Sequence, residues 1–198
     1  MRKISLFIHS TFNGVVTGDP REDKTNFMAW TTNNSLEVGS DALLEAMENV
    51  DTILLGRGTY EDLSRKWPIM PAISDIPLGK KINSAHKIVV TGDRPLDELK
   101  WGDYETPEQL TGDNVVNQIK DLKMTDGGDI IIFGSPVLVR SLTEADLIDK
   151  YIIQVHTVVT NDGERLFDTL SEQKDFRLIE AKALDDTSLL VTFEPVKA

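Results

Sequence analysis

The stretch that decides the fold is "DGGDIIIFGSPVLVRSL", residues 126–142. Apolar β-forming residues run from Ile130 to Phe133, Gly134-Ser135 follows, and a proline-started amphipathic segment comes next, which predicts a strand, a tight turn and a helix. The first N–H groups of a helix have no partner inside it, and glycine lets a ligand approach the backbone closely. The turn is therefore either a plain connection or a phosphate site at a helix N-terminus.

Strands and helices alternate on the N-terminal side of this stretch. We expect strands at residues 3–9, 51–56 and 86–92 and helices at 41–49, 59–67 and 113–124, with Ser40 as the first N-cap. The proline-punctuated segment 68–77 is expected to be a loop. After residue 149 three strands follow without a helix, and "DDT" joins the last two as an antiparallel hairpin.

This pattern predicts an α/β fold in a single domain over residues 1–198. The central sheet should be mostly parallel, with helices on both faces and a C-terminal antiparallel hairpin. The length fits one sizeable domain, and 40% hydrophobic residues suffice for a core.

Composition narrows the classes of partner. The net charge is −12, which argues against a nucleic-acid partner and requires any anion site to be built locally. The chain has no cysteine, which excludes disulfides and thiolate metal sites. His9, His86 and His156 lack ligand spacing, so no metal is expected. The first apolar stretch is too short for a signal peptide, and no run is long enough to span a bilayer, so we expect a cytoplasmic protein without a membrane partner.

Three predicted strand ends share a pattern of a glycine with hydroxyl, basic or helix-starting residues nearby. They are "LLGRGTYE" (54–61), "VVTGDRP" (90–95) and "IFGSPVL" (132–138). Ligands of open α/β sheets bind outside the carboxyl ends of the strands, so one elongated phosphate-bearing ligand could span all three. Arginines here are suited to bidentate phosphate binding, although each alone could be a solvated surface side chain.

The order and spacing of these segments resemble the dihydrofolate reductase-like superfamily. The resemblance runs through "ILLGRGTYE", "KIVVTGDR" and "GGDIIIFGSPVLVRSLTEADLIDKYIIQVHTVV…DGERLF", and it includes "STFNG" where the family usually has Ser-x-Asp-Gly. Within the superfamily the chain looks like the small stand-alone relatives of the riboflavin-pathway pyrimidine reductase, the RibD C-terminal domain. This resemblance favours the phosphate interpretation of the Gly134-Ser135 turn.

The resemblance implies NADPH as the cofactor, bound across the strand ends. By family position, the pyrophosphate and adenosine lie at Gly56, Arg57 and Thr59, and the ribose 2′-phosphate lies near Thr91 and Arg94. The turn residues Gly134 and Ser135, with Val137, cap the pyrophosphate. The nicotinamide lies along Val16 and Gly18.

The substrate side is less determined. Asn13 stands where the family often has aspartate, and an amide can orient a ring edge but cannot act as a general acid or base. Asp41 is a candidate catalytic carboxylate, and its alternative role is to stabilise a helix N-terminus. Aromatic side chains could line the binding site of a flat ring or simply pack in the core. The candidates for the binding site are Phe27, Trp30 and Tyr60, whereas core or lid packing is favoured for Trp67.

The resulting functional hypothesis is an NADPH-dependent reductase of a small heteroaromatic substrate. The substrate could be a 5-amino-6-(5-phosphoribosylamino)uracil-type pyrimidine of riboflavin biosynthesis, a pterin or a folate. The alternative is a non-catalytic nucleotide- or pterin-binding module on the same fold. The resemblance and the apolar late strands also favour a homodimer. The sequence alone names neither the physiological substrate nor the group that supplies the proton.

Overall fold

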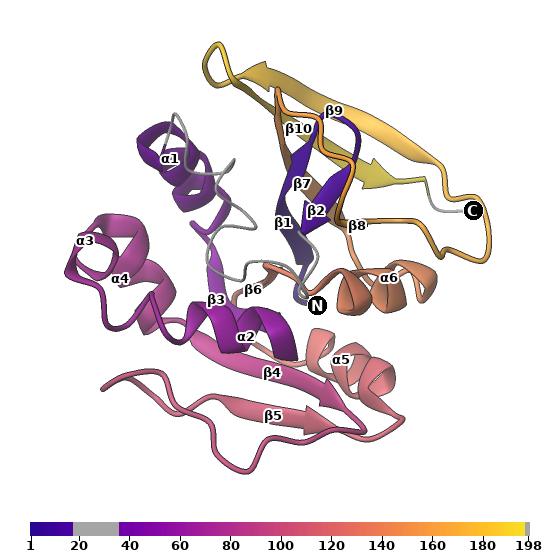
Figure 1. The fold of residues 1–198 in the computed structure, drawn as a ribbon. Helices are drawn as coiled ribbons and strands as arrows, with labels where there is room; N and C mark the ends of the chain where they lie inside the picture. The colour runs from indigo at the N-terminus through magenta and orange to yellow at the C-terminus, as the bar shows by residue number, and fades with distance from the viewer. Residues whose placement is uncertain (18–35, 197–198) are drawn as a thin grey trace.

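The computed structural model describes residues 1–17 and 36–196 of the chain. Its centre is an eight-stranded sheet in the order β5-β4-β3-β6-β1-β7-β10-β9 (Figure 1). The strands are β1 (Ile4–Thr11), β3 (Val50–Gly56), β4 (His86–Gly92), β5 (Glu108–Thr111), β6 (Asp129–Ile132), β7 (Lys150–His156), β9 (Phe176–Ala183) and β10 (Ser188–Pro195). A separate two-stranded sheet pairs β2 (Val15–Thr17) with β8 (Glu164–Arg165).

The strands from β5 to β7 all pair in parallel, whereas β10 is antiparallel to both β7 and β9. The mostly parallel sheet and the C-terminal antiparallel hairpin are therefore confirmed. β6 carries three consecutive isoleucines, 130–132, each fully buried because helices cover both faces of the sheet at this strand. In Figure 1 the hairpin lies at the sheet edge, and β9 is exposed along nearly all of its length.

Six helices are described, and they divide between the two faces of the sheet. They are α1 (Leu36–Ala46), α2 (Arg57–Leu63), α3 (Pro71–Ser74), α4 (Pro77–Ser84), α5 (Val115–Lys123) and α6 (Pro136–Glu144). Side chains of α5 and α6 pack into one apolar core, which includes Ile119 and Val139. Side chains of α1, α2 and α4 pack into the other core, which includes Met47, Tyr60 and Ile82.

Several predicted boundaries are wrong for identifiable reasons. The first helix begins at Leu36, so Ser40 is not its N-cap, and the glycine-serine pair is helical. A Cβ atom at Gly39 would lie 3.0 Å from Oε1 of Gln154, so glycine lets α1 pack closely on β7. The proline-rich segment contains α3 and the start of α4, because proline suits the first helical position. The short strands β2, β5 and β8 were not predicted.

Candidate functional site

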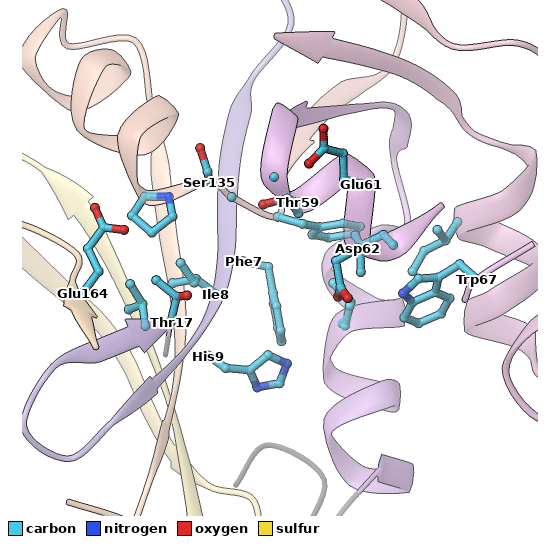
Figure 2. A pocket seen from close by; sticks show the side chains of 18 of the residues that line it. Phe7, Ile8, His9, Thr17, Thr59, Glu61, Asp62, Trp67, Ser135 and Glu164 are labelled. Carbon is cyan, nitrogen blue, oxygen red and sulfur yellow. The ribbon is translucent and has the colours of Figure 1, made fainter. Parts of the chain in front are cut away.

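A cavity of about 490 Å³ lies at the carboxyl ends of β1, β3 and β6. Its lining has two regions, which Figure 2 shows from close by. The region that we call the turn side surrounds the connection after β6 and comprises Val16, Thr17, Gly58, Thr59, Gly134, Ser135, Pro136 and Glu164. The region that we call the α1 side lies toward α1 and α4 and comprises Phe7, His9, Leu43, Asp62, Leu63, Arg65, Trp67 and Ile82.

The turn side is built mainly from backbone. Gly134 adopts a φ of 121°, its peptide bond to Ser135 is cis, and its carbonyl accepts a hydrogen bond of 2.8 Å from the N–H of Gly56. A Cβ atom at Gly56 would lie 2.7 Å from the nitrogen of Ser135, and one at Gly134 would lie 2.9 Å from Oγ1 of Thr59. The two glycines therefore allow the ends of β3 and β6 to approach each other closely.

Gly58 differs from these two glycines. It lies in the first turn of α2, and a Cβ atom there would meet nothing within 4 Å, so this position faces open space in the cavity. The helix α6 starts directly after Ser135, with proline at its first turn and no side-chain cap at its N-terminus. Two helix beginnings thus border the same space, and the first N–H groups of a helix, which have no acceptor within the helix itself, are suited to an anionic ligand.

The predicted arginines lie beside this space rather than in its lining. The Nε atom of Arg57 is 3.0 Å from Oε1 of Glu61, and NH1 donates to the carbonyl of Arg94 over 3.2 Å. The side chain of Arg94 is 79% exposed. Thr91 is buried and donates to Oε1 of Gln109 over 3.1 Å. The structure therefore brings the ends of β3 and β4 together, as the sequence suggested.

The α1 side is largely apolar. Phe7 and His9 point from β1 toward this region in Figure 2, and Trp67 lies across the space from them. Trp67 follows α2 and is half-buried; it packs against the core, in line with the core or lid packing favoured above, and it also lines the cavity. Flat aromatic walls on both sides fit a planar heterocycle.

The most unusual contact of the α1 side joins two histidines. Nδ1 of His9 lies 3.0 Å from Nε2 of His156 on β7, and the ring centroids are 5.2 Å apart. Burial, together with the neighbouring His156, lowers the pKa of His9 to about 4. Burial also lowers the pKa of His156. Both rings are therefore neutral near pH 7.

The carboxylates of the lining are neutralised by cations from outside it. Glu61 pairs with Arg57 at 3.0 Å, and Asp62 pairs with Nζ of Lys66 at 2.7 Å. Glu164 pairs with Arg140. Arg65 is the basic residue of the lining, and no ion pair of this side chain occurs among the residues that the structure describes. The net effect is a lining without an unpaired acidic group in its described part.

Asn13, predicted for the catalytic site, lies outside the cavity lining. Its Oδ1 atom accepts a hydrogen bond from Oγ1 of Thr11 over 2.9 Å, and its Nδ2 atom donates to the carbonyl of Thr160 over 2.7 Å. These bonds fasten the β1–β2 turn to the segment after β7. The amide already has two protein partners, and its role at the ring stays a prediction.

Asp41 and Tyr60 are also placed away from the cavity. Asp41 is exposed in the middle of α1, so the premise that it begins a helix is wrong, and so is its alternative role at a helix N-terminus. Tyr60 is buried, and its hydroxyl donates to the carbonyl of Lys100 over 3.0 Å and accepts from the N–H of the same residue over 2.7 Å. Its contacts are those of a structural side chain.

The remaining predicted residues divide into three groups. Val16, Thr59, Gly134 and Ser135 line the cavity together. Val137 is 60% exposed on α6, and Pro136 takes its place in the lining. Gly18, Phe27 and Trp30 lie outside the described residues.

The residue that the sequence analysis missed is His9. The two histidines are 147 positions apart, and only the parallel pairing of β1 with β7 brings them together. The available signal was their similar position near the ends of two predicted strands. Across residues 1–17 and 36–196, no group of three or more potential metal ligands occurs, and no helix is long and apolar enough to cross a membrane.

The geometry described so far defines a dihydrofolate reductase-like α/β protein with a cavity at its strand ends. The family description of the RibD C-terminal domain matches residues 3–190, and the chain belongs to this family. An uncharacterised protein of Bacillus subtilis, YwjB, is 27% identical over 177 residues, which cover 89% of each chain.

Three solved structures show similar folds. A putative riboflavin biosynthesis protein from Shewanella sp. PV-4 has a TM-score of 0.70 at 18% identity, covering 98% of this chain and 99% of that one. Dihydrofolate reductase from Enterococcus faecalis, complexed with NADP(H), has a TM-score of 0.61 at 14% identity, covering 98% and 97%. The Thermotoga maritima diaminohydroxyphosphoribosylaminopyrimidine deaminase/5-amino-6-(5-phosphoribosylamino)uracil reductase has a TM-score of 0.64 at 16% identity, covering 98% of this chain and 57% of that one.

Proposed function

We propose that this protein is an NADPH-dependent reductase of a small heteroaromatic substrate. The observation that carries the proposal is the turn side of the cavity, where two helix beginnings and open space at Gly58 meet at the carboxyl ends of parallel strands. Helix N-termini and closely approachable backbone are suited to a pyrophosphate. The Enterococcus faecalis protein of the same fold is complexed with NADP(H), which supports this choice of cofactor.

The residues of the turn side fit such a cofactor in chemistry. Thr59 and Ser135 offer hydroxyl and backbone donors for a pyrophosphate, and Val16 offers an apolar surface for the nicotinamide. Arg57 and Arg94 lie together beyond the lining and are suited to a ribose 2′-phosphate. Gly134 lines the same space, whereas Gly18, Gly56, Thr91 and Val137 remain in the proposed cofactor site on the resemblance alone.

The protein's part in the reaction is to bind and orient the two reactants. When bound, NADPH supplies a hydride to the carbon of a polarised double bond in the substrate. The heteroatom of that bond gains a proton, and the products are the reduced substrate and NADP⁺. The apolar α1 side excludes bulk water from the reacting atoms and holds the ring flat.

The experiment that tests this function has two stages. NADPH and NADH are first titrated into the purified protein to compare their dissociation constants. Consumption of NADPH is then followed with 5-amino-6-(5-phosphoribosylamino)uracil, oxidised pterins, dihydrofolate and flavins. We expect NADPH to bind more tightly than NADH and to be oxidised with one of these heterocycles. Failure of both cofactors to bind would overturn the proposal.

The second candidate is a non-catalytic nucleotide- or pterin-binding module. It is favoured by the absence of an unpaired carboxylate in the described lining, since carboxylates commonly serve as proton donors at such sites. The two candidates differ in one measurement. The module would bind NADPH without oxidising it in the presence of any of these heterocycles, whereas the reductase would turn over.

We also propose that the protein forms a homodimer through its C-terminal hairpin. β9 is a long edge strand, and its residues Leu178 and Ile179 are 56% and 46% exposed. An exposed apolar edge strand favours pairing with another copy. Light scattering at micromolar concentration should show twice the 22.1 kDa of one chain. A Leu178→Lys variant should shift this mass toward the monomer; a wild-type monomer would contradict the proposal.

A further inference from the structure

The α1 side of the cavity contains one neutral polar group within a mostly apolar wall. Of its eight lining residues, Phe7, Leu43, Leu63, Trp67 and Ile82 are apolar. Asp62 and Arg65 are charged and lie on or after α2, toward solvent, and Asp62 already pairs with Lys66. His9, on β1, is more buried than these two charged residues. A ligand that enters this region therefore meets the imidazole of His9 as its inner polar contact.

Two neighbours hold the ring of His9 in place. Nδ1 lies 3.0 Å from Nε2 of His156, and the ring of Phe7 meets the ring of His9 edge-on, with centroids 5.7 Å apart. His156 is itself buried on the neighbouring strand, where its Cα atom is paired with that of Thr11. The orientation of His9 is therefore fixed by β1 and β7, the rigid centre of the sheet.

The second nitrogen of His9 is the one available to a ligand. In the part of the chain that the structure describes, Nε2 makes no hydrogen bond, and His9 lines the cavity. Because both rings are neutral, the proton shared between Nδ1 and His156 decides whether Nε2 donates or accepts. A fixed neutral imidazole can hydrogen-bond a carbonyl or an N–H group of a ligand. A ligand with a cationic ring edge would need a carboxylate partner, and the described lining has no unpaired carboxylate.

We propose that His9 is the residue that hydrogen-bonds the polar edge of the bound ring, and that His156 is its positioning residue. This inference rests on the proposed function and deepens it, because it assigns the group that recognises the substrate. Trp67 and Phe7 flank the ring, and His9 selects a neutral edge such as the imide of a uracil. The pair is more than a packing contact, because His9 also lines the cavity and its Nε2 atom has no hydrogen bond in the part of the chain that the structure describes.

The test uses a neutral probe and a readout that does not depend on turnover. Protein labelled with ¹⁵N is titrated with 5,6-diaminouracil, and the imidazole nitrogen signals of the three histidines are followed. We expect saturable shifts at Nε2 of His9 and smaller changes at His156. The signals of His86, which lies at the far end of β4 beside Glu105 and Glu108, should not move.

Variants separate recognition from folding. His9→Leu should weaken binding of 5,6-diaminouracil about tenfold or more, the loss expected for one buried hydrogen bond, and His9→Gln should restore part of it. His156→Leu should weaken binding less and change the tautomer signal of His9. His86→Gln is the matched control and should bind as wild type does. Thermal unfolding of each variant shows whether it is folded.

The outcomes also distinguish this inference from the proposed function. If saturating 5,6-diaminouracil moves no signal of His9, or if folded His9→Leu binds it as tightly as wild type, the inference is overturned. NADPH binding is measured in parallel and should be unchanged in His9→Leu. Wild type that binds the uracil at His9 but does not bind NADPH would contradict the proposed cofactor and leave the recognition role of His9 intact.

Discussion

The turn side and the α1 side of the cavity are built on different principles. The turn side consists of glycines, small hydroxyl residues and helix beginnings, so its shape is fixed by backbone geometry at adjacent strand ends. The α1 side consists mainly of large side chains from β1, α1, α4, the end of α2 and the segment after it, and the contact between His9 and His156 joins two strands. The backbone groups of the turn side could bind many phosphate-bearing ligands, whereas the side chains of the α1 side can distinguish one ring from another.

The largest expected effect lies on the turn side, at Gly58. Because a Cβ atom there meets open space, Gly58→Leu should fill the proposed path of the pyrophosphate without disturbing the fold. Glycine in a helix also costs about 1 kcal/mol relative to a good helix former, so the melting temperature should not fall. We expect NADPH binding to become undetectable by titration. Normal NADPH binding by folded Gly58→Leu would remove the cofactor from this region.

Gly134→Val is the matched variant in the same turn. This variant should also abolish NADPH binding, but it should disturb the turn as well. Gly134 has a positive φ, and an added Cβ atom would lie 2.9 Å from Oγ1 of Thr59. We therefore expect its melting temperature to fall, unlike that of Gly58→Leu. Circular dichroism and thermal unfolding of both variants separate loss of the ligand site from loss of the turn.

The next effect concerns the α1 side, whose buried histidines make stability depend on pH. The pKa of His9 is about 4 in the folded protein, below its ordinary value of 6.5, so the unfolded chain binds the proton more tightly. Stability is then complete above pH 6.5 and falls as the pH drops toward 4, by up to about 3 kcal/mol. His156, whose pKa is also lowered, contributes in the same direction.

Urea unfolding at several pH values checks this prediction. Wild type should lose stability between about pH 6.5 and pH 4, and His9→Asn should lose clearly less over the same range. A His9→Asn variant with the full wild-type pH dependence would show that carboxylates elsewhere cause it. The turn side has no histidine in its lining, so NADPH binding by His9→Asn should match that of wild type.

A smaller effect is expected at the edge of the turn side. Arg94→Ala should weaken NADPH binding about tenfold and leave NADH binding unchanged. The side chain of Arg94 is exposed, so its hydrogen bond to a phosphate should contribute a free energy at the lower end of the range for charged hydrogen bonds. Arg57→Ala should weaken NADPH binding somewhat more, since Arg57 is more buried and lies beside Arg94. Arg177→Ala on the C-terminal hairpin is the control. Equal binding of NADPH and NADH by wild type would contradict the assignment of these arginines.

The local fold of the turn after β6 could be predicted from sequence, and four of the eight turn-side residues were among the predicted site residues. Strand, glycine and helix start follow one another within a few residues, so the local pattern "IIIFGSPVL" already contains the geometry that the structure shows. The parallel order of the sheet followed from the alternation of elements. The family resemblance assigned Val16, Thr59, Gly134 and Ser135 to the cofactor site, and these four residues line the cavity; their contact with a cofactor stays a prediction.

The α1 side could not be predicted in the same way. Its contacts depend on which strands become neighbours, and β1 pairs with a strand nearly 150 positions further along the chain. α1 also approaches Gln154 closely at Gly39, a contact that no local pattern reveals. An error of five residues in the start of one helix moved Asp41 from a helix end beside the cavity to an exposed position in mid-helix.

The smallest expected effect concerns Asp41, which the sequence placed at a helix end and the structure places within α1. Asp41 is exposed and does not line the cavity, so Asp41→Asn should change turnover by less than about twofold, as surface substitutions away from a site usually do. Its melting temperature should also stay close to that of wild type, because Asp41 is not at the N-terminus of α1. Steady-state kinetics with whichever heterocycle proves to be reduced, beside the kinetics of His9→Gln, is the measurement. A loss of 10²–10⁴-fold, the range of a general acid, would restore Asp41 to the catalytic role that the sequence suggested and would place the decisive polar group of the α1 side on α1 instead of β1.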